Sequence, residues 1–401
     1  MKPARFVLGF RFTCSAVVLL LLCLTVVTGG QAQATPPQDQ QSQSGASGTK
    51  QAPPPEAGGP ESDTSPYALP KVNPDKDERP APPPKPKPTE GMPSYSINVN
   101  VPLVTIDALV LTKDGQFIPG LTKEQFRVFE DNVEQPIQSF GLTKAGYTAV
   151  LLVEFASTNY AFMADALRAS YAFTGQMQKN DYVSLISFDM RPQILVDFTS
   201  DKQQVLAALN KLRIPGFSET NVFDALYDTL DRLDRIEGRK EIILIASGRD
   251  TFSRITYDKV LKKIKNTRNV TIYTISTGAF LRALVEGRNT GMTGQMREMD
   301  YLQADNQMNT FAKMTGGRWF SPRFQGELPE DFRLIADSVR NQYSISYKPS
   351  NPKLDGTYRK LKLQLVQPGT DKPLIVKDQK GKDVKYQILS REGYTARHEV
   401  D

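Results

Sequence analysis

The periodicity of hydrophobic and polar positions changes twice along the chain after residue 94. Apolar and polar residues alternate in SINVNVPLVTIDALVLT and FRVFEDNVEQPIQSFGL, a period of two that predicts strands. From residue 146 onward, continuous apolar runs such as YTAVLLVEF and EIILIAS alternate with segments of helical period such as VFDALYDTLDRL. After residue 341 the period of two returns in QYSISYKPS, YRKLKLQLVQ and YQIL. The pattern predicts an α/β domain between two β segments.

Continuous apolar strands that alternate with amphipathic helices are typical of a doubly wound parallel sheet covered on both faces. We predict this α/β fold for residues 146–325. The flanking segments, residues 94–145 and 341–397, each hold too few strands to be stable alone. We therefore expect them to pair into one β-sandwich, with the α/β domain inserted into it.

The first 93 residues have a different composition. A positively charged start, an apolar run and an Ala-Gln-Ala pattern predict a secretory signal peptide over residues 1–34. The alternative is an uncleaved membrane anchor. Residues 35–93 are rich in Pro, Gln, Ser and Gly and are predicted to be a disordered linker. We expect an exported protein, either secreted or held in the periplasm or cell envelope, which meets the membrane only if the signal segment is retained.

Composition excludes several kinds of chemistry. Both cysteines, Cys14 and Cys23, fall in the predicted signal segment, so disulfide and thiol chemistry are not expected. The single histidine, His398, lies near the C-terminus, where it cannot serve a histidine-assisted nucleophile or a zinc site. The 50 basic and 44 acidic residues are interspersed without a basic stripe, so no nucleic-acid partner is expected.

Polar residues follow three of the predicted buried strands. Ligands of doubly wound sheets bind at the carboxyl ends of the strands. Glu154 ends the run VLLVE, Thr220 lies in the loop PGFSETN, and Ser247 begins SGRD, which ends at Asp250. Any metal ion held there would need oxygen ligands, because histidine and cysteine are missing from this region.

The α/β segment resembles a von Willebrand factor A domain. Residues 98–397 also resemble an acidobacterial subfamily of von Willebrand A-related proteins, on the stretches LTKEQFRVFEDNVEQPI, RNQYSISYKPSNPKLDGTYRKLKLQL and REGYTAR. The family carries a metal-ion-dependent adhesion site built from Asp-x-Ser-x-Ser, a Thr and an Asp. The resemblance places these positions on Glu154, Ala156, Thr158, Thr220 and Ser247, so the adhesion site is degenerate.

A degenerate site of this kind would hold a metal ion weakly. One carboxylate remains where the family has two, so we expect no firmly bound cofactor and only weak affinity for Mg²⁺ or Ca²⁺. Asp250 could swing in as a second carboxylate. The alternative is a site without metal, in which Glu154 accepts hydrogen bonds from the Thr158 and Thr220 hydroxyls and from backbone amides.

A further segment follows the predicted strand VTIYTIST. We expect GAFLRALVEGRNTGMTGQMREMD, residues 278–300, to form a long loop on the same face. Met and Arg are common at protein contacts. The candidate partner-binding residues are Arg282, Arg288, Met292 and Met296. The alternative is an insertion without a partner.

These interpretations lead to a non-enzymatic binding or adhesion-type protein. Its α/β domain would contact an unidentified protein or cell-surface ligand through the carboxyl ends of its strands. One alternative is a structural or assembly component of the cell envelope that uses the β-sandwich. The other is a metal-assisted hydrolase, in which Glu154 and Asp250 would form the acid–base pair without a histidine.

Overall fold

The structure is a computed structural model that describes residues 103–397, except 144, 158–159, 213–214, 286–291 and 378–379. Ser94–Asp401 form one compact unit. The predicted signal segment (1–34), the predicted linker (35–93) and His398 lie outside the described residues. None of the described helices is both long and apolar enough to span a membrane.

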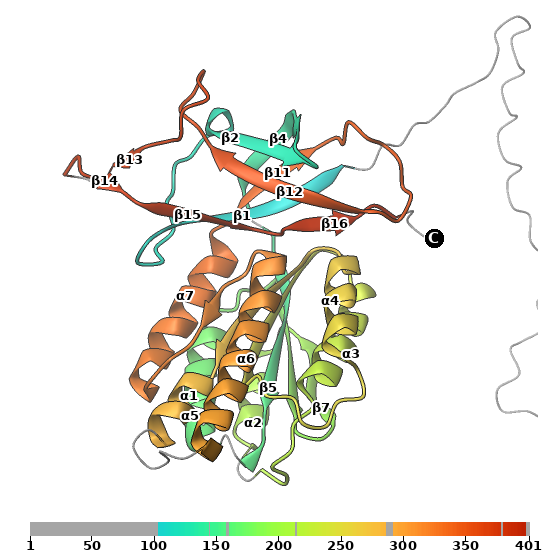
Figure 1. The fold of residues 1–401 in the computed structure, drawn as a ribbon, viewed down its shortest axis with the longest axis vertical. Helices are drawn as coiled ribbons and strands as arrows, with labels where there is room; N and C mark the ends of the chain where they lie inside the picture. The colour runs from blue at the N-terminus through green and yellow to red at the C-terminus, as the bar shows by residue number, and fades with distance from the viewer. Residues whose placement is uncertain are drawn as a thin grey trace, which may run out of the picture. The chain divides into compact units, whose positions relative to one another are not determined.

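A six-stranded sheet in the order β10-β9-β8-β5-β6-β7 forms the centre of the α/β domain (Figure 1). Its first five strands are parallel, which confirms the predicted doubly wound fold. The edge strand β7 is antiparallel, because the turn between β6 and β7 is too short for a crossover connection. The strands are β5 (Tyr147–Glu154), β6 (Tyr182–Phe188), β7 (Pro192–Thr199), β8 (Arg239–Ala246), β9 (Val270–Ser276) and β10 (Trp319–Phe320).

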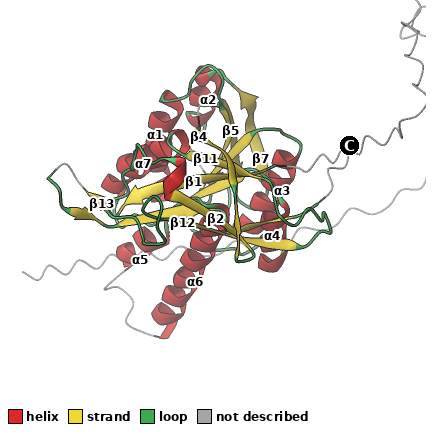
Figure 2. Ribbon diagram, turned by 90° about the horizontal axis from the view of Figure 1, so that it is seen from above, coloured by secondary structure: helices red, strands yellow, loops and turns green. Residues whose placement is uncertain are grey.

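Helices cover both faces of this sheet (Figure 2). Successive side chains of β5 point to opposite faces, so Leu151 and Val153 enter one core while Val150 and Leu152 enter the other. The first core also receives α1 (Tyr160–Gly175), α2 (Lys202–Leu209), α5 (Gly278–Val285) and α7 (Leu328–Arg340). The second receives α3 (Val222–Asp234), α4 (Tyr257–Asn266) and α6 (Met292–Thr315).

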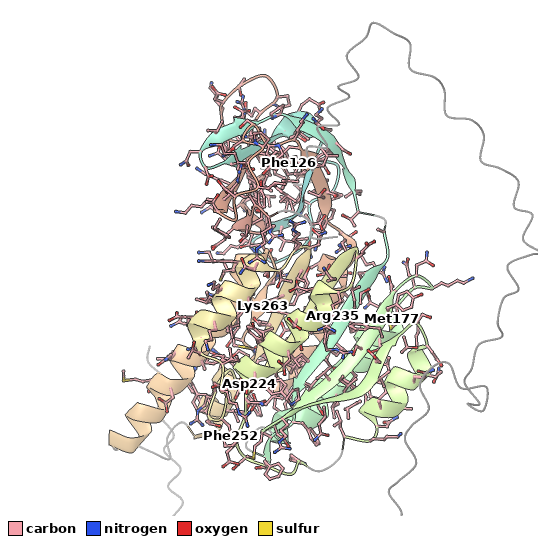
Figure 3. All side chains as sticks on the ribbon, turned by 90° about the vertical axis from the view of Figure 1, so that its right-hand side faces the viewer. Phe126, Met177, Asp224, Arg235, Phe252 and Lys263 are labelled. Atoms are coloured by element: carbon pink, nitrogen blue, oxygen red, sulfur yellow. The ribbon has the colours of Figure 1, made fainter. Side chains whose placement is uncertain are left out.

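The flanking segments form two four-stranded sheets around a shared core, which confirms the predicted sandwich. Each sheet mixes strands from both ends of the chain, and Phe126, labelled in Figure 3, lies in the core between them. One sheet holds β1 (Val104–Thr112), β4 (Ile137–Leu142), β11 (Tyr343–Tyr347) and β15 (Tyr386–Ser390). The other holds β2 (Phe126–Glu130), β3 (Val133–Gln135), β12 (Tyr358–Leu365) and β16 (Gly393–Thr395). Smaller elements are the hairpin β13 (Val376–Lys377) and β14 (Asp383–Val384), and the short 3-10 helices Lys123–Gln125 and Gln325–Glu327.

The inserted domain begins and ends at neighbouring points of the sandwich. β4 and β11 pair directly, and the Thr143 amide donates to the Gln342 carbonyl at 2.9 Å. Arg239 of β8 adds a link, since its guanidinium lies 3.8 Å from the Asp107 carboxylate of β1. The carboxyl ends of the parallel strands point away from this junction (Figure 1).

The prediction of a long loop over residues 278–300 is wrong for the described residues. α5 begins at Gly278 and α6 at Met292. α5 buries Ala279, Phe280 and Leu281 against the first core. The glycines of this stretch suggested a loop, but burial of such apolar side chains against a sheet outweighs the helix-weakening effect of glycine.

Candidate site at the strand ends

A buried carboxylate lies at the end of β5. Glu154 is 0% exposed, and its Oε2 accepts the Ser247 amide at 2.6 Å and the Ser247 hydroxyl at 2.9 Å. Ser247 follows β8, which pairs with β5 in the sheet. Two neighbouring strand ends therefore bring Glu154 and Ser247 into direct contact.

The electrostatic setting of Glu154 is unusual for a glutamate. Burial raises its pKa to about 7, and the two hydrogen bonds from Ser247 oppose only part of that rise. No described cation forms an ion pair with Glu154. The carboxyl group is therefore poised between its neutral and charged forms near neutral pH.

Thr220 lies in the neighbouring loop but does not bond to Glu154. Its carbonyl accepts the amides of Thr251 and Phe252 at 2.9 and 3.0 Å, and its amide donates to the Thr251 hydroxyl at 2.9 Å. The Thr220 hydroxyl is buried and has no hydrogen-bond partner among the described residues. The metal-free alternative expected a backbone amide on Glu154, which Ser247 provides, but it is wrong for Thr220, because the hydroxyl donor among the described residues is Ser247. Thr158 lies outside the described residues.

Asp250 serves a helix rather than Glu154. Its Oδ1 accepts the Phe223 amide at 3.3 Å and the Ser253 hydroxyl at 2.5 Å. Phe223 lies in the first turn of α3, where backbone amides lack partners within the helix and a negative charge is favourable. The carboxylate expected to swing toward Glu154 is therefore occupied at the start of α3.

The donor set at the strand ends does not fit Mg²⁺ or Ca²⁺. Both ions prefer six or more oxygen ligands, with carboxylates supplying the charge. Here Glu154 offers one carboxylate that already accepts from Ser247, and the loop before α3 adds the unpartnered oxygens of the Thr220 hydroxyl and the Asn221 amide, which carry no charge. Among the residues that the structure describes, no group of three or more Asp, Glu, His or Cys side chains could hold a metal ion.

Backbone hydrogen bonds tie the strand-end loops together. The Ser157 amide donates to the Phe217 carbonyl at 2.7 Å, and the Asn221 amide donates to the Asp189 carbonyl at 2.9 Å. Together with the bonds between Thr220 and the loop after β8, these contacts link the loops that follow β5, β6 and β8 to the loop before α3. We call the resulting surface, residues 155–157, 189–191, 215–221 and 247–255, the strand-end face.

Two phenylalanines are exposed on the strand-end face. Phe217 is 53% exposed and Phe252 is 51% exposed. Figure 3 shows Phe252 at the end of the α/β domain far from Phe126 of the sandwich. Sequence reasoning missed both residues, although each is an isolated aromatic residue in a polar loop, Phe217 between α2 and α3 and Phe252 after β8, which is a usable signal for a contact site.

Arg282, a candidate for partner binding, instead joins two helices. Its Nη1 lies 2.7 Å from Oδ2 of Asp305 in α6, and the Ser276 hydroxyl donates to the other oxygen of Asp305. Arg288 lies outside the described residues. Met292 and Met296 fall in the first turns of α6 by their backbone. The ion pair therefore holds α5 against α6 beside the end of β9.

We expect Arg282→Met to lower the free energy of unfolding by about 2 kcal/mol, because Asp305 is left buried without its counter-charge. The loss is smaller than for a fully buried pair, since 24% of the Arg282 side chain is exposed. Urea unfolding measures it. Arg333→Met is the matched control, because its pairs with Glu330 and Asp337 are about half exposed and should contribute less than about 0.5 kcal/mol. Equal losses in the two variants would contradict the assignment.

The von Willebrand factor type A domain family matches residues 156–249 of the chain. The search for similar curated proteins found no match to this chain.

Solved structures with a similar chain path come from several organisms. The von Willebrand domain of a type V pilus tip protein from Porphyromonas gingivalis is 13% identical, with 49% of this chain and 96% of that chain covered and a TM-score of 0.38. A von Willebrand factor type A protein from Catenulispora acidiphila is 11% identical, with 73% and 75% covered and a TM-score of 0.37. Proximal thread matrix protein 1 from the mussel byssus is 13% identical, with 52% and 50% covered and a TM-score of 0.38.

Proposed function

The chain is a von Willebrand factor type A domain protein, and from that premise we propose that it is a non-enzymatic binding protein. Its strand-end face would contact a protein or cell-surface partner without a metal ion. We further propose that it is exported, that residues 1–34 direct export, that residues 35–93 form a flexible linker, and that it belongs to the acidobacterial subfamily it resembles.

The observation that carries the proposal is the pair of half-exposed phenylalanines on a cross-linked face. Phe217 and Phe252 expose large apolar side chains where the surrounding loops are polar. Aromatic side chains that become buried on binding provide much of the energy of protein interfaces. The hydrogen bonds from Ser157 to Phe217 and from Phe252 to Thr220 fix the loop backbones, so little conformational entropy would be lost on binding.

The same geometry argues against the hydrolase alternative. A carboxylate pair would have to face one substrate at hydrogen-bond distance. Glu154 is fully buried and bonded to Ser247, whereas Asp250 bonds to the start of α3. The two carboxylates therefore serve separate structural contacts.

A photo-crosslinking experiment tests the binding proposal. The photoreactive amino acid benzoylphenylalanine is placed at position 217, 252 or 182 of the exported protein, and adducts are analysed after irradiation of intact cells. Tyr182 is the matched control, because it is an aromatic residue, 47% exposed, at the start of β6. We expect adducts from positions 217 and 252 and none from 182.

Alanine variants give the quantitative form of this test. We expect Phe217→Ala and Phe252→Ala each to weaken recovery of the crosslinked partner by about tenfold, as for anchor residues of protein interfaces. Tyr182→Ala should leave recovery unchanged. A partner that crosslinks to sandwich positions and ignores both phenylalanine variants would favour the alternative in which the sandwich acts as a structural contact.

A further inference from the structure

A second candidate site lies at the opposite end of the α/β domain from the strand-end face. It is a cavity of about 420 Å³ between the start of β9 and the sandwich strands β12 and β16. We propose that this cavity binds a small organic anion, a phosphate or carboxylate head group joined to an apolar body. Its volume falls within the range of small-molecule sites, roughly 300–1,000 Å³.

The charge of the cavity walls is one-sided. Five cationic side chains line it and no carboxylate does, among the residues that the structure describes. Glu130 neutralises Arg359 at 2.9 Å, but Lys353, Arg391 and Arg397 form no ion pair with any described carboxylate. A cavity with such unbalanced charge attracts an anion, because field lines are focused in a concave, partly apolar site. The cationic residues are Arg268, Lys353, Arg359, Arg391 and Arg397.

Arg391 is the residue best placed to hold the anionic head group. Its Nε donates to the Gly393 carbonyl at 2.8 Å and its Nη2 donates to the Thr267 carbonyl at 3.3 Å. These bonds fix the plane of the guanidinium, whose planar donors match phosphate and carboxylate oxygens. Burial lowers the pKa of Arg391, and nearby Tyr358 and Asp107 oppose only part of that shift, so a bound anion would further stabilise its charge.

The rest of the lining combines polar residues with an apolar set that would contact the second part of the ligand. The apolar set consists of prolines and aliphatic residues, and an inorganic ion alone would leave this surface unfilled. A ligand with an apolar body would bury it and gain from its removal from water. The apolar residues are Leu103, Val104, Pro349, Pro352, Leu354 and Ala396.

Phenyl phosphate is the probe for this proposal, measured by isothermal titration calorimetry against the purified protein. Phenol supplies the same apolar body without the anion, and inorganic phosphate supplies the anion without the body. We expect phenyl phosphate to bind at least about tenfold more tightly than either, because both halves of the cavity contribute free energy. Arg391→Gln should weaken phenyl phosphate binding at least about tenfold and Lys353→Gln about threefold, in line with the strength of charge-assisted contacts.

Lys362→Gln is the control, since Lys362 is an exposed residue of β12 that does not line the cavity. The exposed Lys353 keeps the test valid if Arg391→Gln impairs folding, which circular dichroism reports. Absence of phenyl phosphate binding in the wild-type protein, equal affinity for inorganic phosphate, or wild-type affinity in the Lys353→Gln variant would each overturn the proposal. Binding seen only after removal of residues 398–401 would also overturn it, by showing that the chain fills its own cavity.

Discussion

Replacement of Arg359 by methionine should lower the free energy of unfolding by about 3–5 kcal/mol, the usual cost of removing one partner from a buried ion pair. Arg359 is 2% exposed and Glu130 is 3% exposed, and their charged atoms lie 2.9 Å apart. Without the guanidinium, the donors left to the Glu130 carboxylate among the described residues are the hydroxyls of Tyr347 and Tyr394, at 2.5 and 2.9 Å. Urea unfolding in the absence of added ligand measures the loss.

The double variant Arg359→Met/Glu130→Gln provides the control for this interpretation. It removes both charges, so no uncompensated ion stays in the sandwich core. We expect it to recover at least about 1 kcal/mol relative to the single variant, because the penalty of an unpaired buried charge is gone. A double variant less stable than Arg359→Met would show that packing and the bonds of Arg359 to the carbonyls of Asn351 and Lys353 dominate instead.

The stability contributed by Glu154 should depend on pH. Its pKa is raised from 4.5 to about 7 in the folded protein, so the folded state binds the proton more tightly than the unfolded state. The resulting stabilisation is fully present below pH 4.5 and is lost as the pH rises through about 7. As the pH rises from 5 to 8, ionisation of Glu154 should therefore lower the free energy of unfolding of the wild type by about 2–3 kcal/mol.

Glu154→Gln isolates this effect, because the variant carries a neutral side chain at every pH. We therefore expect the free energy of unfolding of Glu154→Gln, relative to that of the wild type, to increase by about 2–3 kcal/mol between pH 5 and pH 8. Other buried acids, such as Glu241 and Asp331, are present in both proteins and cancel in the difference. A constant difference for Glu154→Gln would contradict the burial argument.

The architecture could be predicted from sequence because it rests on periodicity. The period of two in the flanking segments and the continuous apolar runs between them identified the sandwich and the sheet. The pattern predicts a helix on NTFAKMTG, the second half of α6, where Met308 and Phe311 are buried. The first half was missed because it exposes apolar residues such as Met299 and Leu302. No continuous apolar stripe marks such a helix.

The chemistry of the strand ends was less accessible to sequence reasoning. The resemblance to the adhesion-site motif located Glu154 and Ser247 at strand ends. The hydrogen-bond partners of their side-chain oxygens, however, depend on the path of the loop that follows each strand. Gly248 adopts a φ of +77°, a left-handed conformation that glycine adopts readily, and a Cβ there would lie 2.8 Å from Met308. This turn places the Ser247 amide and hydroxyl on Glu154 and carries Asp250 to α3. Such geometry follows from tertiary packing and not from residue spacing.

The pairing of β1 with β11 has a consequence for how the chain folds. Thr105 and Ser346 share a hydrogen bond although they are 241 residues apart in sequence. Bringing such distant strands together is entropically costly while the intervening chain is unfolded. Once the α/β domain has formed, its two ends lie side by side, as the contact between Thr143 and Gln342 shows, and the search for the partner strand becomes short. Folding of the inserted domain therefore lowers the entropic cost of pairing β1 with β11. During synthesis, the sandwich can be completed only after the α/β domain has been made.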